Sequence, residues 1–192
     1  MNILSLNCRG CGQSEAVREL RLLVETYKPA LVFLMETKLS KDRTLELQRA
    51  LGFPNAHVVP AVGLSGGLAL FWRRDVVVFA QTMSRSHIDA FISGDAFGGK
   101  QWRFTGFYGE PRREMRKNSW YLLRFLRAQS DLPWLCAGDF NEVLSPECFG
   151  VLWRTYPPSG AAVRFYDALG FVYPRTVTDA SWRLLKEAEL AK

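Results

Sequence analysis

The hydrophobic and polar positions of the first 50 residues predict a strand, a helix and a second strand. Asn2 to Asn7 has a short apolar centre between asparagines, which is typical of a strand. Apolar residues then recur at helical spacing over Glu15 to Tyr27, until Pro29 ends the pattern. Ala30 to Met35 is almost continuously apolar, as in a strand buried on both faces. We expect a βαβ unit whose two strands are parallel neighbours.

The middle of the chain has a different pattern. A second helix is predicted from Asp42 to Leu51, with Asp42 as its N-cap. Short strand-like runs separated by turn residues then form a meander, over 57–60, 67–72, 76–80, 87–93 and 102–108. Asn118 or Ser119 begins a third helix, which leads to the apolar strand Pro133 to Ala137. This order favours an α/β (α+β) fold with two packed sheets and the helices outside.

The pattern weakens after Phe149, and we place a boundary there. Residues 1–149 are predicted to form the folded domain, and residues 150–192 a divergent C-terminal tail with one or two short helices. In the tail, 153–160 has a loop-like composition, 161–169 could form one short helix, and a last helix could begin at Asp179. With 192 residues, 48% of them hydrophobic, the chain is long enough to bury a core.

Polar side chains follow the predicted strands at the points where they end. Asn7 ends the first strand, Glu36 follows the second, and Tyr108 closes the meander. Asp139 and Asn141 follow the last apolar strand and can face the same side if the extended geometry continues. Because α/β proteins bind ligands at the carboxyl ends of their strands, we expect these residues to converge. For Asp139 and Asn141 taken alone, an Asx turn that closes the strand is the alternative.

These residue types suit metal-assisted chemistry on a phosphate ester. Glu36 and Asp139 are hard oxygen donors that could share a Mg²⁺ ion, or Mn²⁺ in its place, with Asn7 beside them. Asn7 and Asn141 can hold a phosphate oxygen or a water molecule, and Tyr108 offers a phenolic donor for an oxygen that develops charge. Taken singly, each residue also fits a structural role in a turn or at the edge of the core.

The chain is mildly basic, with 25 Lys and Arg against 19 Asp and Glu and a formal net charge of +6. Such a charge suits a polyanionic partner. Part of it lies shortly after Tyr108, in Arg112, Arg113, Arg116 and Lys117, which we predict to contact the phosphate backbone of a nucleic acid. A solvated helix face is the alternative explanation.

Cysteine usage and targeting signals add little to this picture. Cys8 and Cys11 have the C-x-x-C spacing of zinc and redox sites, but Cys136 and Cys148 are too far apart to form a second pair, so we expect reduced structural thiols. Both histidines lie in strand-like runs and are expected to pack there. Because we find neither a membrane span nor a cleavable signal, we expect an intracellular protein without a membrane partner. The oligomeric state stays open.

Four ordered motifs resemble one known family. They are Leu6-Asn7-Cys8-Arg9-Gly10, Met35-Glu36-Thr37-Lys38, Phe107-Tyr108-Gly109-Glu110-Pro111 and Gly138-Asp139-Phe140-Asn141-Glu142. They occur in the order seen in the endonuclease/exonuclease/phosphatase superfamily, also called DNase I-like. The sequence of residues 131–142 is especially similar to that of the endonuclease domain of plant LINE-type retrotransposons.

The resemblance implies a four-layer α/β sandwich and Mg²⁺-dependent nicking of DNA, which in a retrotransposon primes reverse transcription. It implies that Glu36 binds the metal, that Asn7 supports that site and that Tyr108 stabilises the phosphate. Asp139 and Asn141 would position the attacking water and the phosphate. DNA as the partner and a nuclear location are implied by the resemblance alone.

The sequence departs from the family pattern in two places. Leu6 stands where the family often has Trp, and no His follows Asn141, although family members carry a late His that contacts the scissile phosphate. The resemblance therefore implies a domain truncated at its C-terminus, incomplete in its second half and weakly active or inactive. The alternatives are a non-catalytic nucleic-acid-binding remnant, a phosphatase of the same fold and a gene fragment without a selected function.

Overall fold

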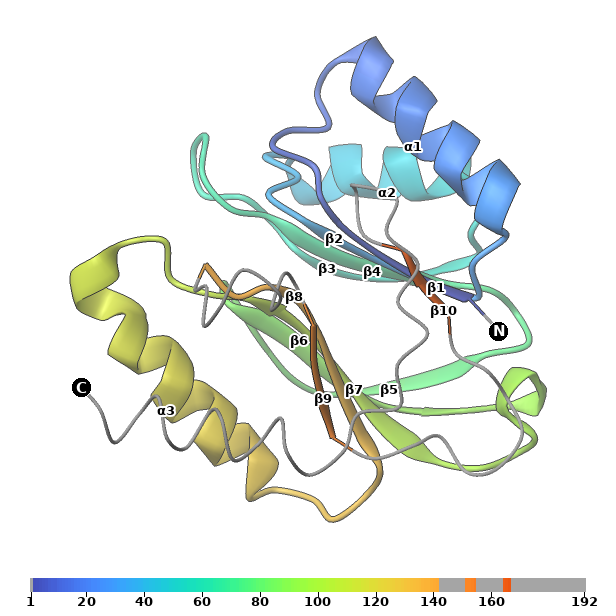
Figure 1. The fold of residues 1–192 in the computed structure, drawn as a ribbon. Coiled ribbons are helices and arrows are strands. Elements are labelled where there is room, and N and C mark those ends of the chain that lie inside the picture. The colour runs from blue at the N-terminus through green and yellow to red at the C-terminus, as the bar shows by residue number, and fades with distance from the viewer. Residues whose placement is uncertain (1, 142–150, 155–163, 167–192) are drawn as a thin grey trace.

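The computed structural model of the protein describes residues 2–141, 151–154 and 164–166. They form four layers, in which two β-sheets pack face to face and α-helices cover the outer face of each sheet (Figure 1). The predicted four-layer α/β sandwich is confirmed. Within these residues, no helix is both long enough and apolar enough to cross a membrane.

The first sheet combines strands from both ends of the described chain. Its strands are β1 (Asn2–Asn7), β2 (Leu31–Met35), β3 (Asn55–Val59), β4 (Leu68–Trp72) and β10 (Arg164–Tyr166). Their spatial order is β10-β1-β2-β4-β3. The neighbours β1 and β2 run parallel, as the βαβ pattern predicted. All five residues of β2 are buried, which explains the continuous apolar run that predicted this strand.

The second sheet contains the later part of the predicted meander. Its strands, in spatial order, are β5 (Val77–Ser84), β6 (His87–Ser93), β7 (Trp102–Tyr108), β8 (Trp134–Asp139) and β9 (Val151–Arg154). A short 3-10 helix, η1 (Asp95–Phe97), lies between β6 and β7. The meander is thus divided between the sheets, because β3 and β4 pair beside β2. The neighbours β7 and β8 run parallel, so their carboxyl ends lie together.

Two strands come from the segment that we predicted to be a divergent tail. β9 pairs antiparallel with β8, and β10 pairs parallel with β1. The expected loop over 153–160 and the expected helix over 161–169 are therefore wrong where these strands lie. Strands of three and four residues are too short to show a periodicity that distinguishes them from other structures. The helix expected from Asp179 lies outside the described residues, and the domain boundary at 149 stays a prediction.

The described residues form three α-helices, which are α1 (Ser14–Tyr27), α2 (Lys41–Ala50) and α3 (Arg116–Arg127). Leu20 of α1 and Leu47 of α2 are buried with Val32 and Phe71 of the first sheet. α3 buries its apolar side against β7 and β8 of the second sheet. Each helix therefore covers one sheet, with its apolar side packed against that sheet.

Two predicted helix starts are wrong by two or three residues. The N-cap of α2 is Ser40 and not Asp42, because the side-chain oxygen of Ser40 accepts a hydrogen bond from the Arg43 amide. α3 begins at Arg116, ahead of the predicted Asn118, because the 3-10 helix η2 (Arg113–Met115) leads directly into it. Helix boundaries commonly differ by this much from a prediction.

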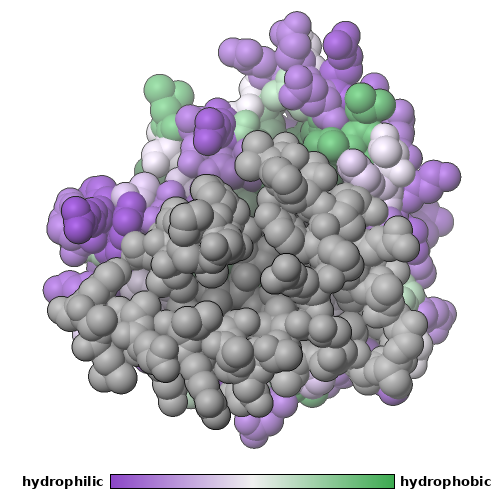
Figure 2. Space-filling model, in the orientation of Figure 1, coloured by the Kyte–Doolittle hydropathy of each residue, from purple (hydrophilic) through white to green (hydrophobic). Residues whose placement is uncertain are grey.

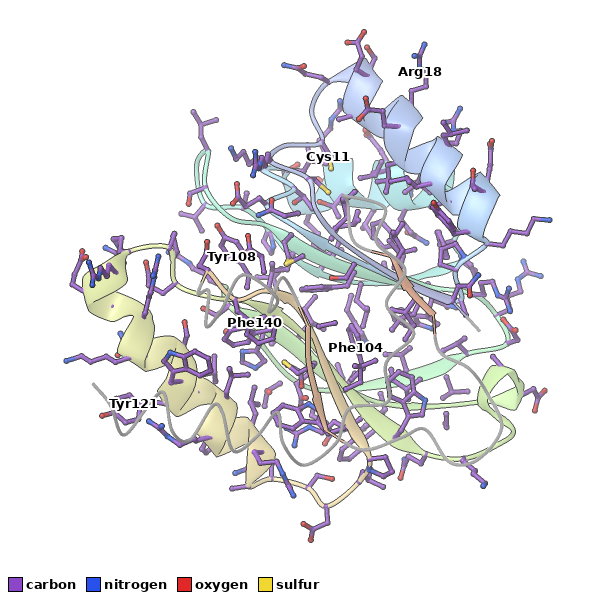
Figure 3. All side chains as sticks on the ribbon, in the orientation of Figure 1. Cys11, Arg18, Phe104, Tyr108, Tyr121 and Phe140 are labelled. Carbon is purple, nitrogen blue, oxygen red and sulfur yellow. The ribbon has the colours of Figure 1, made fainter. Side chains whose placement is uncertain are left out.

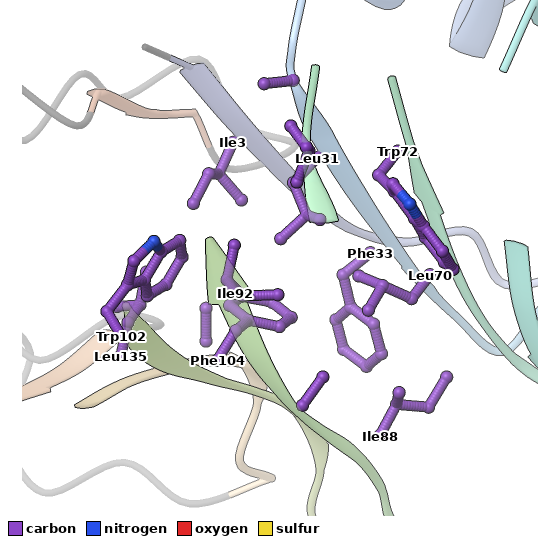
Figure 4. Packing of buried hydrophobic residues seen from close by; sticks show 14 of the residues in the cluster. Ile3, Leu31, Phe33, Leu70, Trp72, Ile88, Ile92, Trp102, Phe104 and Leu135 are labelled. Carbon is purple, nitrogen blue, oxygen red and sulfur yellow. The ribbon is translucent and has the colours of Figure 1, made fainter. Parts of the chain in front are cut away.

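A large cluster of buried hydrophobic residues lies between the two sheets. Phe33 and Leu70 of the first sheet face Ile88 and Phe104 of the second (Figure 4). The rings of Phe33 and Phe104 meet edge to face, with their centroids 6.1 Å apart. Each large apolar side chain buried here contributes about 1.5–3 kcal/mol, so this layer holds the sheets together.

Gly106 in β7 lets the two sheets approach closely. A Cβ atom at this position would lie 2.4 Å from the ring of Phe33, nearer than any two such atoms can come. Phe33 is fully buried, and protein cores are close-packed, so its ring could withdraw only by displacing its neighbours. The contact between Phe33 and Gly106 thus sets the spacing of the sheets at this point.

A buried ion pair joins the second sheet to α3. Asp89 of β6 and Arg103 of β7 are each 1% exposed and form two hydrogen bonds, of 2.8 and 2.9 Å. The remaining Arg103 nitrogen donates to the Leu126 carbonyl at the end of α3, at 2.5 Å. The Thr105 hydroxyl donates to Asp89, at 2.5 Å. This network was not predicted from the sequence.

We expect Asp89→Ala to lower the free energy of unfolding by about 3–5 kcal/mol, because it leaves the Arg103 guanidinium buried without a counter-charge. Urea unfolding followed by circular dichroism measures the change. Asp75→Ala is the matched control. Asp75 pairs with Arg73 on the surface, and its loss should cost less than about 1 kcal/mol. Similar losses in the two variants would show that the buried pair contributes no more than a surface pair.

We expect Gly106→Ala to destabilise the protein by about 1–3 kcal/mol, because the added methyl group overpacks the layer between the sheets. Gly12→Ala serves as the control, since a Cβ at Gly12 has nothing within 4 Å. Both variants are compared by the same urea unfolding measurement. Adding Phe33→Leu should recover part of the Gly106→Ala loss, and strictly additive losses would show that the two residues do not constrain each other.

Candidate active site

The carboxyl ends of β1, β2, β7 and β8 meet at one edge of the two packed sheets. In the first sheet Asn7 pairs in register with Met35, so Glu36 follows directly beside Asn7. In the second sheet Tyr108 pairs in register with Asp139. The backbone amide of Asp139 lies 3.1 Å from the Met35 sulfur, across the boundary between the sheets. Parallel pairing within each sheet and packing between the sheets therefore bring the predicted residues together.

The amide of Asn7 connects two carboxylates that come from different sheets. Its nitrogen donates to Glu36 Oε1 at 3.2 Å and to Asp139 Oδ2 at 3.0 Å. The Tyr108 hydroxyl donates to the same Glu36 oxygen at 2.6 Å (Figure 3 labels Tyr108). Four of the five side chains that were expected to converge thus form one hydrogen-bonded group.

Asn141 reaches the site in a way that the sequence did not predict. Its backbone has a φ of +52°, so the extended geometry does not continue beyond β8. Its amide N–H donates to Asp139 Oδ1 at 2.9 Å, which is the Asx turn that we weighed as the alternative. The Asn141 side chain donates to the Gly109 carbonyl at 2.7 Å and also bonds to Tyr108. Asn141 therefore fixes Asp139 and the end of β7 relative to each other.

Left-handed backbone conformations gather around this site. Arg9, Glu36, Lys38 and Asn141 have φ values of +49°, +50°, +54° and +52°. The remaining non-glycine residue with positive φ in the described chain is Lys28, which ends α1. Such a conformation costs an L-residue about 1–2 kcal/mol. Strain of this kind collects at functional sites, so its distribution points to the same edge as the side chains.

Backbone hydrogen bonds hold the strained turn after β2. The amides of Thr37 and Lys38 donate to the carbonyls of Gly67 and Gly66, at 3.1 and 3.0 Å. The Cys11 amide donates to the Thr37 carbonyl at 2.9 Å. The turn that carries the Glu36 carboxylate is therefore fixed from both sides.

Neighbouring groups change the protonation of Glu36 and Tyr108. Burial raises the pKa of Glu36, but hydrogen bonds from Tyr108 and Asn7 and the charges of Lys38 and Arg9 outweigh it and lower that pKa. Burial and the hydrogen bond to Glu36 raise the pKa of Tyr108 well above its usual value. At neutral pH the site therefore holds an ionised Glu36 and a protonated Tyr108.

Sequence reasoning missed two cations at the site. Lys38 Nζ lies 3.8 Å from Glu36 Oε2, and the charge of Arg9 acts on the same carboxylate. Both residues stand inside the motifs that located the site, two positions after Glu36 and Asn7 respectively. Their proximity depends on the left-handed turns described above, which no spacing rule predicts.

Comparison with protein families gives one clear result. A family model described as the endonuclease/exonuclease/phosphatase family matches residues 2–183. The chain belongs to this family. The match includes Asn7, Glu36, Tyr108, Asp139 and Asn141. No curated protein matches the chain.

Several solved structures are similar in fold to this chain. The endonuclease domain of TRAS1, a telomere-specific non-LTR retrotransposon, has 17% identity and a TM-score of 0.52 over 73% of this chain. The 3'-5' exonuclease NExo from Neisseria meningitidis has 20% and 0.53 over 74%. TDP2 of D. rerio, complexed with a single strand DNA product, has 16% and 0.52 over 73%. The matches cover 60%, 59% and 60% of those structures, so the chain spans about three-fifths of their length.

The donor set of this family member fits a magnesium ion. Glu36 and Asp139 supply two carboxylates, which the Asn7 amide nitrogen holds together, while Asn7 Oδ1 accepts a hydrogen bond from the Arg9 amide at 3.1 Å. Within the described residues no group of three or more His, Cys, Asp or Glu is arranged to hold a metal. Mg²⁺ does not need such a group, because it is commonly bound through one or two carboxylates together with water and substrate phosphate.

Both histidines of this family member pack within the sheets, as predicted. The His57 ring lies 4.8 Å from the ring of Trp72, measured between centroids. His87 is buried, and its two ring nitrogens form hydrogen bonds with Thr82 at 2.9 Å and Ser84 at 2.8 Å. Neither ring takes part in the group around Asn7.

The cysteines near the site are free thiols. Cys8, Cys11 and Cys136 form no disulfide, and Cys148 lies outside the described residues. A hydrogen bond between the two thiols raises the pKa of Cys8 and lowers that of Cys11. Burial raises the pKa of Cys136.

The predicted basic residues lie between the end of β7 and the first turn of α3, where Figure 2 shows hydrophilic side chains gathered. Arg112 forms a surface ion pair with Glu110, at 2.8 Å. Arg113 belongs to η2, and Arg116 and Lys117 begin α3. Basic residues in a first turn oppose the helix dipole, so helix stability does not explain them. Their contact with phosphate stays a prediction.

Proposed function

We propose that this chain hydrolyses phosphodiester bonds of DNA with Mg²⁺ or Mn²⁺, and that it derives from a retrotransposon endonuclease. The observation that carries this proposal is the amide of Asn7, which holds Glu36 and Asp139 from two sheets beside the Tyr108 hydroxyl. Membership of the endonuclease/exonuclease/phosphatase family supports a phosphodiesterase-type hydrolase, and enzymes of this family generally use divalent metal ions.

The proposed origin and substrate rest on similarities to other proteins. Residues 131–142 are similar in sequence to plant LINE-type endonuclease domains, and TRAS1 is itself a retrotransposon. The TDP2 structure contains a DNA product. An intracellular and nuclear location belongs to the same proposal.

In this proposal Glu36 and Asp139 hold the metal, which when bound would polarise a phosphoryl oxygen and offset the charge of the phosphate. Asn7 orients both carboxylates through its amide nitrogen. The Asp139 carboxylate accepts the proton of the attacking water as its oxygen bonds to phosphorus and the P–O bond to the leaving strand breaks. Asn141 holds Asp139 in place, and the Tyr108 hydroxyl, which donates to Glu36 in this structure, would turn its proton to the oxygen on which charge develops once Glu36 holds the metal.

The rate is expected to be low. Residues 142–192 contain no His, so this part of the chain offers no counterpart of the family's late contact with the scissile phosphate. Loss of one preorganised donor to a transition state costs about 10²- to 10³-fold in rate. Lys38 and Arg9 place positive charge near Glu36. They belong to the N-terminal part of the sequence, whereas the family's His comes late in the chain.

We expect weak nicking of supercoiled plasmid in Mg²⁺ and none in EDTA. Asp139→Ala and Glu36→Gln should abolish the nicking, and Tyr108→Phe should slow it by about 10²- to 10³-fold, because it removes one donor. Asp131→Ala is the control, since Asp131 is a fully exposed aspartate outside the site. Nicking that continues in EDTA or in Asp139→Ala would show a contaminating nuclease or a different site.

Metal binding is expected to stabilise the folded protein without any substrate. At a Mg²⁺ concentration of 100 times its Kd, the free energy of unfolding should rise by about 2.7 kcal/mol. Glu36→Gln should remove this increase, whereas Glu46→Gln, on the exposed side of α2, should retain it. Thermal melting with and without Mg²⁺ measures the effect. Equal stabilisation of both variants would place the metal elsewhere.

The alternative function is a domain that binds nucleic acid without cleaving it. The basic residues of α3 favour it, because they could bind phosphates without a metal ion. Such a domain would bind DNA in a salt-dependent manner in EDTA, and Asp139→Ala would bind as well as the wild type while neither protein nicked the plasmid.

A further inference from the structure

α3 exposes two aromatic side chains on the side that faces away from the second sheet. Tyr121 and Phe125 are 61% and 58% exposed, and residues four apart lie on the same face of a helix. The buried residues of α3 are Ser119, Leu123 and Leu126, which lie on the opposite side. Tyr121 points away from the sheet in Figure 3. Neither aromatic ring contributes to the core.

Basic side chains lie along the same exposed face. Lys117 is exposed one turn before Tyr121, and Arg124 is exposed beside Phe125. The Arg124 guanidinium lies 4.8 Å from the centre of the Tyr121 ring. The sequence of α3 contains four basic residues and no acidic one. We refer to Lys117, Tyr121, Arg124 and Phe125 as the α3 strip.

The α3 strip begins close to the candidate active site. The backbone amide of Glu110, two residues after Tyr108, donates to the Ser119 hydroxyl at 2.8 Å. This bond ties the first turn of α3 to the end of β7. At 1.5 Å per residue, the strip from Lys117 to Phe125 leads away from the site over about 12 Å of the helix.

We propose that the α3 strip binds single-stranded DNA. Unpaired bases would stack on Tyr121 and Phe125, and the phosphates between them would contact Lys117 and Arg124. Alternating cations and exposed aromatic rings are the means by which proteins bind unpaired strands. Duplex DNA offers its phosphates but keeps its base faces stacked inside, so it would leave both rings without a partner. The proposal rests on the proposed function in one respect, the choice of DNA as the polymer.

The test is fluorescence anisotropy of a short labelled single-stranded DNA with the full chain, in EDTA so that no cleavage occurs. Tyr121→Ala and Phe125→Ala should each weaken binding by roughly 5- to 150-fold, and Tyr121→Trp should retain it. Phe79→Ala is the matched control, since Phe79 is a 68% exposed phenylalanine on β5. Lys117→Ala should reduce the slope of log K against log salt by about 0.7.

Thermal melting of each variant checks that it folds, which is expected because every substituted side chain is exposed. Wild-type binding by both alanine variants would overturn the proposal. An equal loss in Phe79→Ala, or tighter binding of duplex DNA or RNA of the same sequence, would also overturn it.

The outcome does not depend on catalysis. If Asp139→Ala loses nicking but binds the single strand normally, both proposals stand. If the wild type binds through Tyr121 and Phe125 but never nicks, the proposed function fails and the strip remains. If it nicks DNA but the alanine variants bind normally, the strip alone fails.

Discussion

The spacing of the two sheets is the constraint on which the candidate site depends. Asn7 and Glu36 belong to one sheet, and Tyr108 and Asp139 to the other, so their hydrogen bonds form only at one separation. That separation is set in the core, where the absence of a side chain at Gly106 lets the other sheet approach. A change of a few tenths of an ångström there would move donors and acceptors that now lie 2.6–3.2 Å apart.

The stable core supports a site that is locally unfavourable. Two carboxylates lie against one amide, and several backbone residues around them are held in left-handed conformations. Burial disfavours the ionised Glu36, but donors from Asn7 and Tyr108 and the charges of Lys38 and Arg9 outweigh this cost, so the pKa of Glu36 is lowered. The core therefore holds two carboxylates and a strained backbone together at one edge of the sheets, where the proposed divalent cation would add a further positive charge.

Sequence patterns predicted the parts of the fold that depend on continuous burial. β2 was found because every residue is buried, and the site was found because polar residues lie at the ends of β1, β2, β7 and β8. The patterns failed where structure depends on distant partners. Asp89 and Arg103 are of residue types that usually lie on the surface, and only the ion pair between them makes their burial possible. Asn141 is compatible with both an extended strand end and an Asx turn. The structure has the Asx turn, in which the backbone amide of Asn141 donates to the Asp139 carboxylate. β9 and β10 were missed because such short strands show no periodicity.

α3 is fixed at both ends, and this determines how its outer face can act. Near its start, Ser119 accepts the amide of Glu110, and near its end the Leu126 carbonyl accepts the buried Arg103 guanidinium. A cation at the last turn also suits the helix dipole, so the buried ion pair stabilises the helix that it positions. A helix held in this way keeps the backbone beneath its exposed rings in place, which reduces the backbone entropy lost when a ligand binds. The network beneath α3 and the strip above it are therefore parts of one arrangement, in which burial on one side provides rigidity on the other.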